Sequence, residues 1–230
     1  MLIAQPPFTV LDRNMSLNSH PLPKVVYLAL ALLAGCAVAS DPQSLPVGTE
    51  PVAAPIGYYP LCYNQPNTSA CEKPDKPLPS SQPPDSLDMQ LSIQRVFDYS
   101  SDEDQHGIKE HWASYDSESV YREGFKGDCD DYALTYADSL IREGADPGDI
   151  ALVFAQTRHT PTYHLTVLYR GKIYDNINKW PAYWDTLDYE YLKAMLFDSP
   201  GTWYEVSTKE MGDRSAVGYT GAISQRSDSD

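Results

Sequence analysis

A single cysteine at the start of an apolar helical pattern constrains the fold of this chain most. From Cys129 onward, apolar and aromatic residues recur every three or four positions, which is typical of a helix packed on a core. These residues are Tyr132, Ala133, Tyr136, Ala137, Leu140 and Ile141. Asp128 offers an N-cap oxygen, and Gly144 can take the positive φ that ends a helix. The pattern predicts Cys129 in the first turn, where unpaired N–H groups and the helix dipole favour a thiolate nucleophile.

A candidate base and its orienting group follow in residues 163–176. Two β-rich runs flank residues 170–171, a pattern typical of a hairpin with a two-residue turn. Counting back from that turn makes His164 and Asp175 diagonal neighbours on one face of the sheet. A carboxylate at that position can fix the tautomer of an imidazole. We therefore predict that Cys129, His164 and Asp175 serve as nucleophile, base and orienting group.

Other histidines and acidic residues offer weaker alternatives. His159 could replace His164 as base if its loop folded back over the cleft, but the strand geometry favours His164. The chain has no His-x-x-His or Cys-x-x-Cys pair, which argues against a zinc site. His106 and His111 are expected in loops or beside turn residues, and residues 102–104 are expected in a solvated loop rather than a metal site.

The N-terminal region is predicted to carry an export signal. Residues 24–36 form an apolar run that is too short to span a bilayer but suits the core of a signal peptide, with Met15 a more natural start than Met1. Its last residues, Leu-Ala-Gly-Cys, resemble the lipobox of bacterial lipoproteins, in which Cys36 becomes the lipidated N-terminus. Cleavage after Ala39 would instead release a soluble chain. We expect a periplasmic protein that is anchored through Cys36, or a soluble periplasmic protein.

The remaining cysteines and the net charge agree with export. With Cys36 and Cys129 assigned to lipid and chemistry, Cys62 and Cys71 remain, and an oxidising periplasm would join them in a disulfide. The formal net charge is −15, and no basic cluster is present to neutralise phosphates. The sequence therefore argues against nucleic acid as a partner, and against membrane contact other than through a lipid anchor.

The chain is predicted to contain one α+β domain with appendages. A helix over about residues 86–99 is expected to turn Leu87, Leu91, Val96 and Phe97 inward, and strands are expected at residues 150–157 and 203–206. The predicted segments are a signal peptide over 1–36, a disordered tether over 37–54, an extended Pro-rich segment over 55–85, the domain over 86–208, and a disordered tail over 209–230.

The motif around Cys129 resembles that of a known family. Gly-Asp-Cys-Asp-Asp-Tyr-Ala over residues 127–133, followed by a His at a strand start and Tyr-Asp-Asn over 174–176, is similar to the bacterial transglutaminase-like cysteine proteinases. The likeness extends over about residues 55–206. It implies a papain-like α+β fold, with the nucleophile helix packed on an antiparallel sheet, and cleavage of a peptide bond in an envelope protein. It also implies a biofilm adhesin as the type of substrate, and an inner-membrane receptor as a regulatory partner. The same chemistry can also catalyse transamidation.

Two further roles follow from this resemblance. Asp128, Asp130 and Asp131 surround the thiol, and such a cluster suits calcium, which the family also implies at this motif; Asp130 stands where the family usually has Glu. Trp112 is either an aromatic wall or an oxyanion donor beside the Cys129 backbone N–H. No organic cofactor is expected.

A different class of function is also compatible with these residues. A catalytically silent lipoprotein could use the same cleft to hold an envelope partner, with calcium as a structural ion. A scaffold with Cys129 as a buried apolar residue is a third possibility. The complete set of Cys129, His164 and Asp175 favours the enzyme.

Overall fold

The computed structural model describes residues 45–74, 83–158 and 162–207, which all belong to the unit Ser40–Asp230. The predictions on Met15, Cys36, Ala39, His159 and the tail over 209–230 lie outside these residues. In the part of the chain that is described, no helix is both long and apolar enough to span a membrane. The elements in chain order are β1 Val47–Val52, α2 Tyr58–Asn64, α3 Ser86–Val96, β2 Phe97–Tyr99, α4 Asp102–His106, α5 Ser117–Glu123, β3 Phe125–Gly127, α6 Cys129–Arg142, η1 Pro147–Asp149, β4 Ile150–Thr157, β5 Tyr163–Tyr169, β6 Lys172–Tyr174, β7 Ala182–Tyr183, η2 Trp184–Thr186, β8 Tyr189–Leu196 and β9 Trp203–Val206.

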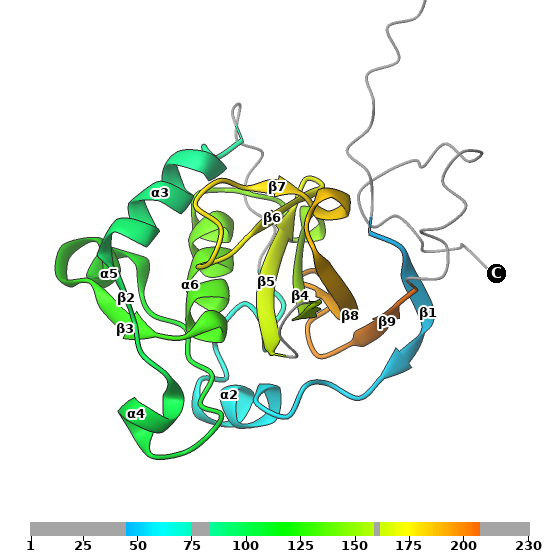
Figure 1. Ribbon diagram of the computed structural model, residues 1–230, viewed down its shortest axis with the longest axis horizontal. Coiled ribbons are helices and arrows are strands. Elements are labelled where there is room, and N and C mark those ends of the chain that lie inside the picture. The colour runs from blue at the N-terminus through cyan, green and yellow to red at the C-terminus, as the bar shows by residue number, and fades with distance from the viewer. Residues whose placement is uncertain (1–44, 75–82, 159–161, 208–230) are drawn as a thin grey trace, which may run out of the picture. The chain divides into compact units, whose positions relative to one another are not determined.

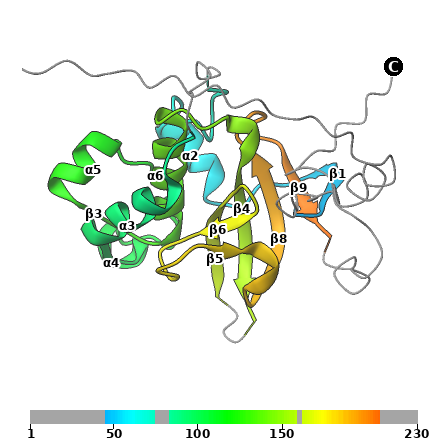
Figure 2. The same ribbon diagram turned by 90° about the horizontal axis from the view of Figure 1, so that it is seen from above.

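A seven-stranded sheet with the order β1-β9-β8-β4-β5-β6-β7 forms the centre of the domain, and all its paired strands are antiparallel. Helix α6 packs on β5 and β4, and α3 and α5 lie on that same side of these strands (Figures 1 and 2). Strands β2 and β3 form a separate parallel pair. The predicted α+β architecture, with the Cys129 helix against an antiparallel sheet, is confirmed.

Two apolar layers lie on the two faces of the sheet. Along β4, Leu152 faces the layer that contains α6, whereas Val153 faces the opposite layer, as expected for a strand whose side chains alternate between faces. On the α6 side, Tyr132 and Trp203 are fully buried. Burial on both faces explains why β4 is apolar along most of its length.

The hairpin has the predicted register. Tyr169 pairs with Lys172 and Leu168 pairs with Ile173, so the loop consists of two residues. Arg170 and Gly171 have φ values of 49° and 76°, the two positive φ values that a type I′ turn requires. Strand β6 ends at Tyr174. Because successive residues of a strand point to opposite faces of the sheet, the next residue, Asp175, lies on the face opposite to that of Tyr174.

The N-terminal half differs from the prediction in several places. Residues 47–52, expected within the tether, form β1 and pair with β9. Residues 58–64, expected to be extended, form α2, which holds Pro60 in its first turn, where a proline is tolerated. The helix expected to reach residue 99 ends at Val96, because the chain then enters β2 beside β3.

The inward face of α3 is also different from the prediction. Leu87 is 39 % exposed, whereas Gln90 and Ile93 are fully buried. The helical period was correct, and Val96 and Phe97 pack against the core as predicted, but Leu87 does not, and the buried glutamine was not expected. That glutamine binds buried backbone oxygens described below.

A disulfide joins Cys62 and Cys71. It connects α2 to the turns that follow, and the Tyr58 hydroxyl donates to the Ala70 backbone oxygen at 2.7 Å in the same loop. The two crosslinks hold this irregular segment against the main apolar layer, to which Tyr58, Leu61 and Ala70 contribute.

Candidate active site

Cys129 is the first residue of α6, and local sequence explains why the helix begins there. The Asp128 carboxylate accepts from the Asp130 backbone N–H at 3.3 Å, and the Asp131 carboxylate accepts from the Asp128 N–H at 3.3 Å, which together form a capping box. At the other end, Gly144 has a φ of 93°. The predicted helix start, cap and C-terminal glycine are all confirmed.

The Cys129 thiol is half-buried and lies against β5. Burial raises its pKa well above the ordinary value, and the Asp130 and Asp128 carboxylates raise this pKa further. A hydrogen bond from the Leu165 backbone N–H lowers the pKa. This bond places the thiol beside the residue that follows His164. In the described residues Cys129 is the free cysteine.

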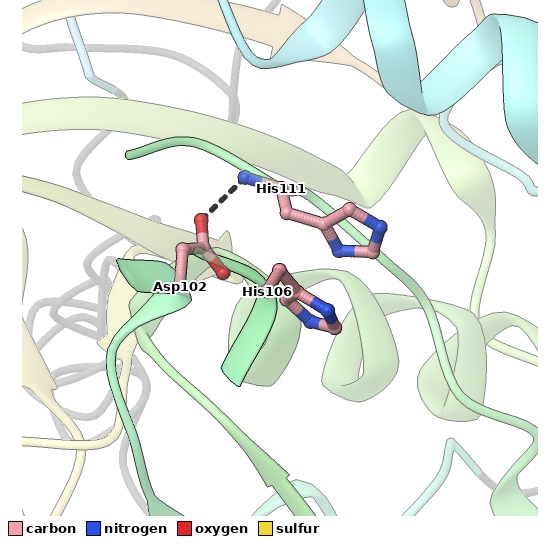
Figure 3. A group of neighbouring side chains, drawn as sticks. All are labelled: Asp102, His106 and His111. Carbon is pink, nitrogen blue, oxygen red and sulfur yellow. Dashed lines mark hydrogen bonds between the residues drawn. The ribbon is translucent and has the colours of Figure 1, made fainter. Parts of the chain in front are cut away.

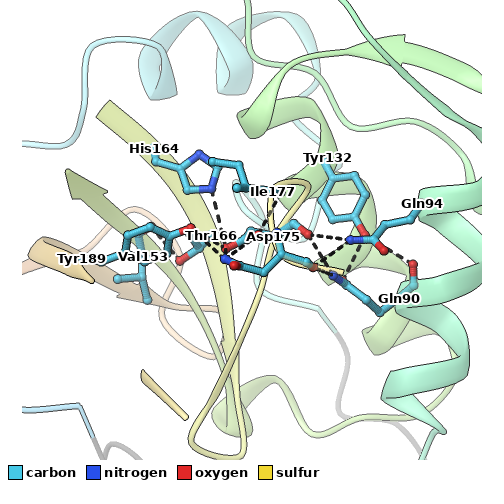
Figure 4. A network of polar contacts seen from close by, with 10 residues as sticks. Gln90, Gln94, Tyr132, Val153, His164, Thr166, Asp175, Ile177 and Tyr189 are labelled. Atoms are coloured by element: carbon cyan, nitrogen blue, oxygen red, sulfur yellow. Dashed lines mark hydrogen bonds and ion pairs between the residues drawn. The ribbon is translucent and has the colours of Figure 1, made fainter. Parts of the chain in front are cut away.

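His164 and Asp175 lie together, as the hairpin register predicts (Figure 4). The His164 Nε2 atom lies 3.7 Å from the Asp175 Oδ2 atom, within ion-pair range but too long for a hydrogen bond. Both side chains are nearly inaccessible, at 4 % and 0 % exposure. The Tyr189 ring lies edge-on to the imidazole with centroids 5.6 Å apart. A negative charge on Cys129 also raises the pKa of Tyr189, so the thiol, the imidazole and the phenol are neighbours.

The Asp175 carboxylate is held by several donors that the sequence analysis did not identify. Its Oδ1 accepts from the backbone N–H groups of Ile177 and Asn178 at 2.9 and 2.7 Å, and its Oδ2 accepts from the Tyr189 hydroxyl at 3.0 Å. The Asn178 side-chain amide donates to both oxygens. Burial raises the pKa of Asp175, but His164 and the Asn178 donors lower it more, so the pKa lies below its usual value.

Helix α3 fixes the loop that carries this carboxylate. The Gln90 side-chain amide donates to the backbone oxygens of Asp175 and Asn178 at 2.8 and 3.0 Å, and Gln94 donates to the same two oxygens. The Tyr132 hydroxyl on α6 donates to Gln90 Oε1 at 3.0 Å (Figure 4). The network therefore links the nucleophile helix to the Asp175 loop. The sequence feature that could have indicated this network is the pair of glutamines four residues apart on one face of α3.

Trp112 lies next to this region but its N–H group is occupied. The indole Nε1 donates to Glu110 Oε2 at 3.1 Å, and the side chain is 4 % exposed. A Cβ atom at Gly57 would lie 2.2 Å from Nε1, so only glycine allows this approach. Glu110 is close enough to Cys129 to raise the pKa of the thiol.

Carboxylates beside the thiol form two overlapping groups. Ligand atoms of Asp128, Cys129 and Asp130 lie within 4.8 Å of one another, and so do those of Asp102, Asp128 and Asp131. Burial raises the pKa of Asp131 to about 8, with further contributions from Asp128 and Asp102, and burial raises the pKa of Asp130 well above its usual value. Asp130 Oδ2 is buried without a hydrogen-bond partner. Asp102, expected in a solvated loop, is 2 % exposed.

Comparison with known proteins identifies the family. The profile of the bacterial transglutaminase-like cysteine proteinases (BTLCP) matches residues 48–211, most of the chain. The protein belongs to this family. The resemblance seen around Cys129 is thereby confirmed, and as a cysteine proteinase the protein acts on a protein substrate. No curated protein matches the sequence.

Solved structures similar to this proteinase include LapG from Legionella pneumophila. The calcium-bound form is 19 % identical with a TM-score of 0.42, and the match covers 52 % of this chain and 67 % of LapG. The EGTA-treated form is 17 % identical with a TM-score of 0.43, over 54 % of this chain and 67 % of LapG.

Proposed function

We propose that Cys129, His164 and Asp175 form the catalytic triad of an exported peptidase that cleaves a cell-envelope protein. One observation carries the assignment of the triad. The thiol at the start of α6 accepts a hydrogen bond from the Leu165 N–H, on the strand where the neighbouring His164 turns Nε2 toward the buried Asp175. A nucleophile, a base and an orienting carboxylate are thus supplied by three separate segments.

The proposed reaction follows from which atoms face each other. Because Nε2 faces Asp175, Nδ1 is the nitrogen that takes the proton from the Cys129 thiol. The thiolate attacks the carbonyl carbon, Nδ1 donates the proton to the leaving amine, and water hydrolyses the thioester with His164 again acting as base. The Asp175 carboxylate holds the imidazole in this orientation and stabilises its charged form.

The oxyanion of the intermediate needs donors near Cys129. The backbone N–H of Cys129 is one, since the first N–H groups of a helix have no partner within it. Trp112 is the proposed second donor. Its N–H becomes available when the exposed Glu110 side chain turns away, for example when substrate enters.

We further propose that the carboxylates beside the thiol bind calcium, with Asp128 and Asp130 as ligands and Asp131 as a further oxygen donor. The buried, unpartnered Oδ2 of Asp130 supports this assignment, because a buried carboxylate oxygen without a donor is costly. When bound, the cation offsets the negative charge that raises the pKa of Cys129. If removal of calcium by a chelator changes neither the melting temperature nor the activity, this assignment is wrong.

The cellular location also remains a proposal. The Cys62–Cys71 disulfide and the signal-like run over residues 24–36 support export to an oxidising periplasm. The intact mass of membrane-extracted protein, with Cys36→Ser as the control, distinguishes lipidation at Cys36 from cleavage after Ala39. A biofilm adhesin is the type of substrate that we would test first.

The deciding experiment combines covalent labelling with a search for cleavage. Purified protein with calcium is treated with E-64 and weighed, beside Cys129→Ala and His164→Ala. We expect one adduct on Cys129, absent from the first variant and at least about 100-fold slower in the second, since base catalysis contributes roughly 10²–10⁴-fold. The same proteins are incubated with a peptide library. Labelling of His164→Ala at the wild-type rate would show that His164 is not the base.

A further inference from the structure

A second group of metal-binding side chains lies on α4 and the segment that follows it. Asp102 and His106 are the first and last residues of α4, and His111 follows the turn at Gly107, whose φ is 69°. Ligand atoms of the three side chains all lie within 4.8 Å of one another. The two imidazole rings lie face to face with centroids 3.9 Å apart and planes inclined by 31° (Figure 3).

The local fold explains this convergence. Residues four apart on a helix share one face, so Asp102 and His106 point to the same side. Ser101 caps α4 through the Asp104 N–H, and the left-handed Gly107 turns the chain back. The backbone N–H of His111 then donates to Asp102 Oδ2, which fixes the returning segment beside the helix (Figure 3).

Two polar atoms of this group are buried without a partner. Asp102 is 2 % exposed, and its Oδ1, the oxygen that does not bind His111, has no hydrogen bond and points toward His106 (Figure 3). His111 Nδ1 is likewise buried without a partner. A buried polar atom without a partner is unfavourable, and a ligand bound by both atoms would remove that cost.

We propose that Asp102, His106 and His111 bind a divalent transition-metal ion, with Zn²⁺ as the best fit. Two imidazole nitrogens and one carboxylate oxygen form a common zinc donor set, in contrast to the all-oxygen set that calcium prefers. His106 is exposed, so water can fill the fourth position. The rings must move apart slightly to direct both nitrogens at one ion, which an exposed side chain allows.

Zinc at this position would crosslink α4 to the segment that leads into the candidate active site. His111 is followed by Trp112, which packs on Gly57, and by Ala113, whose N–H donates to Asp131 Oδ1 at 2.9 Å. The ion would hold these contacts in place without taking part in the thiol chemistry. The proposal therefore does not depend on the proposed function.

The test is zinc binding by the metal-free, desalted protein, measured by calorimetry. We expect one Zn²⁺ whose Kd rises by more than about tenfold in His106→Ala and in His111→Ala, since loss of even an outer-sphere partner of a metal ligand costs 10–100-fold. Co²⁺ bound at the same site should give an intense visible spectrum that both variants lose. The melting temperature of wild type, but not of His106→Ala, should rise with Zn²⁺.

Matched controls make each outcome decisive. Glu103→Gln changes an exposed acidic residue on the same helix, and Cys129→Ala removes the nearby thiol, and both should bind Zn²⁺ as wild type does. His106 is exposed, so His106→Ala keeps the test valid if His111→Ala does not fold. Wild-type affinity in His106→Ala, loss of binding in Cys129→Ala, or no binding by wild type at micromolar Zn²⁺ would each overturn the proposal.

Discussion

At the scale of single residues, the environment of Cys129 opposes the ionisation that the proposed chemistry needs. Burial and the carboxylates of Asp130 and Asp128 raise the pKa of the thiol, against the effect of the helix terminus and the Leu165 N–H. A protein that keeps such carboxylates beside its nucleophile needs a positive charge there when it is active. The imidazolium of His164 and a cation at the acidic group are the two sources proposed above.

The carboxylate effect on the thiol can be measured directly. In calcium-free buffer at pH 7.5, Asp128→Asn, which keeps a capping oxygen, should raise the rate of Cys129 alkylation by iodoacetamide at least severalfold, because removing a neighbouring negative charge lowers the thiol pKa. Asp98→Asn is the control for charge alone, since Asp98 is exposed and pairs with Lys126. A rate unchanged in Asp128→Asn would show that the Asp128 charge does not contribute to the raised pKa of the thiol.

Tyr189 is predicted to position the orienting carboxylate. Tyr189→Phe removes the hydroxyl that donates to Asp175 Oδ2 at 3.0 Å but keeps the ring against His164. We expect kcat to fall about tenfold with little change in KM, and stability to fall by about 1.5–3 kcal/mol, the range for a hydrogen bond to a charged group. Steady-state kinetics and urea unfolding test both. Tyr191→Phe is a matched control, because the Tyr191 hydroxyl donates to the Trp184 backbone oxygen instead.

At the scale of elements, the junction between β3 and α6 depends on one glycine. A Cβ atom at Gly127 would lie 2.3 Å from Asp131 Oδ2 and 2.5 Å from Asp131 Cβ. Gly127→Ala should therefore break the capping box and destabilise the protein by about 1–3 kcal/mol, the usual cost of overpacking. Gly148→Ala is the control, since its nearest neighbour would lie at an ordinary 3.4 Å. Equal unfolding midpoints for the two variants would contradict this account.

The elements also show which parts of the fold the sequence can predict. The hairpin register was predictable because the turn at residues 170–171 sets it locally, and this register brings His164 and Asp175 together. Helix α6 was predictable from its cap and its period. The burial of Gln90 on α3 was not predictable, because it depends on hydrogen bonds to a loop 85 residues away in sequence. Local sequence patterns do not show a hydrogen-bond partner that is so distant along the chain.

The same reason explains what the sequence missed in the candidate sites. Asp102 and His111 meet because a backbone N–H binds a carboxylate across the turn at Gly107, and neither residue belongs to a known spacing motif. Short spacings such as His-x-x-His are the only criterion by which the sequence predicted no zinc site. A site assembled from a helix face and a returning segment escapes that criterion.

At the scale of the whole molecule, the excess of acidic residues should make stability depend on pH and calcium together. The pKa of Asp131 is raised from 3.8 to about 8, and that of Asp130 is also raised, so the folded protein holds protons that the unfolded chain loses near pH 4. Where the folded state binds more protons, stability falls as pH rises. Asp175 has the opposite shift, but its contribution is lost only below pH 3.8, outside this window.

We therefore expect the calcium-free protein to melt at a temperature at least about 5 °C lower at pH 8 than at pH 5.5, since each kcal/mol corresponds to roughly 2–4 °C in a domain of this size. Millimolar calcium should remove most of that difference, because a bound cation stabilises the ionised carboxylates. Asp130→Asn should flatten the calcium-free profile, whereas Asp98→Asn should leave it unchanged. Differential scanning calorimetry measures all of these. A calcium-free melting temperature that stays level or rises between the two pH values would mean that the buried carboxylates are ionised without a cation.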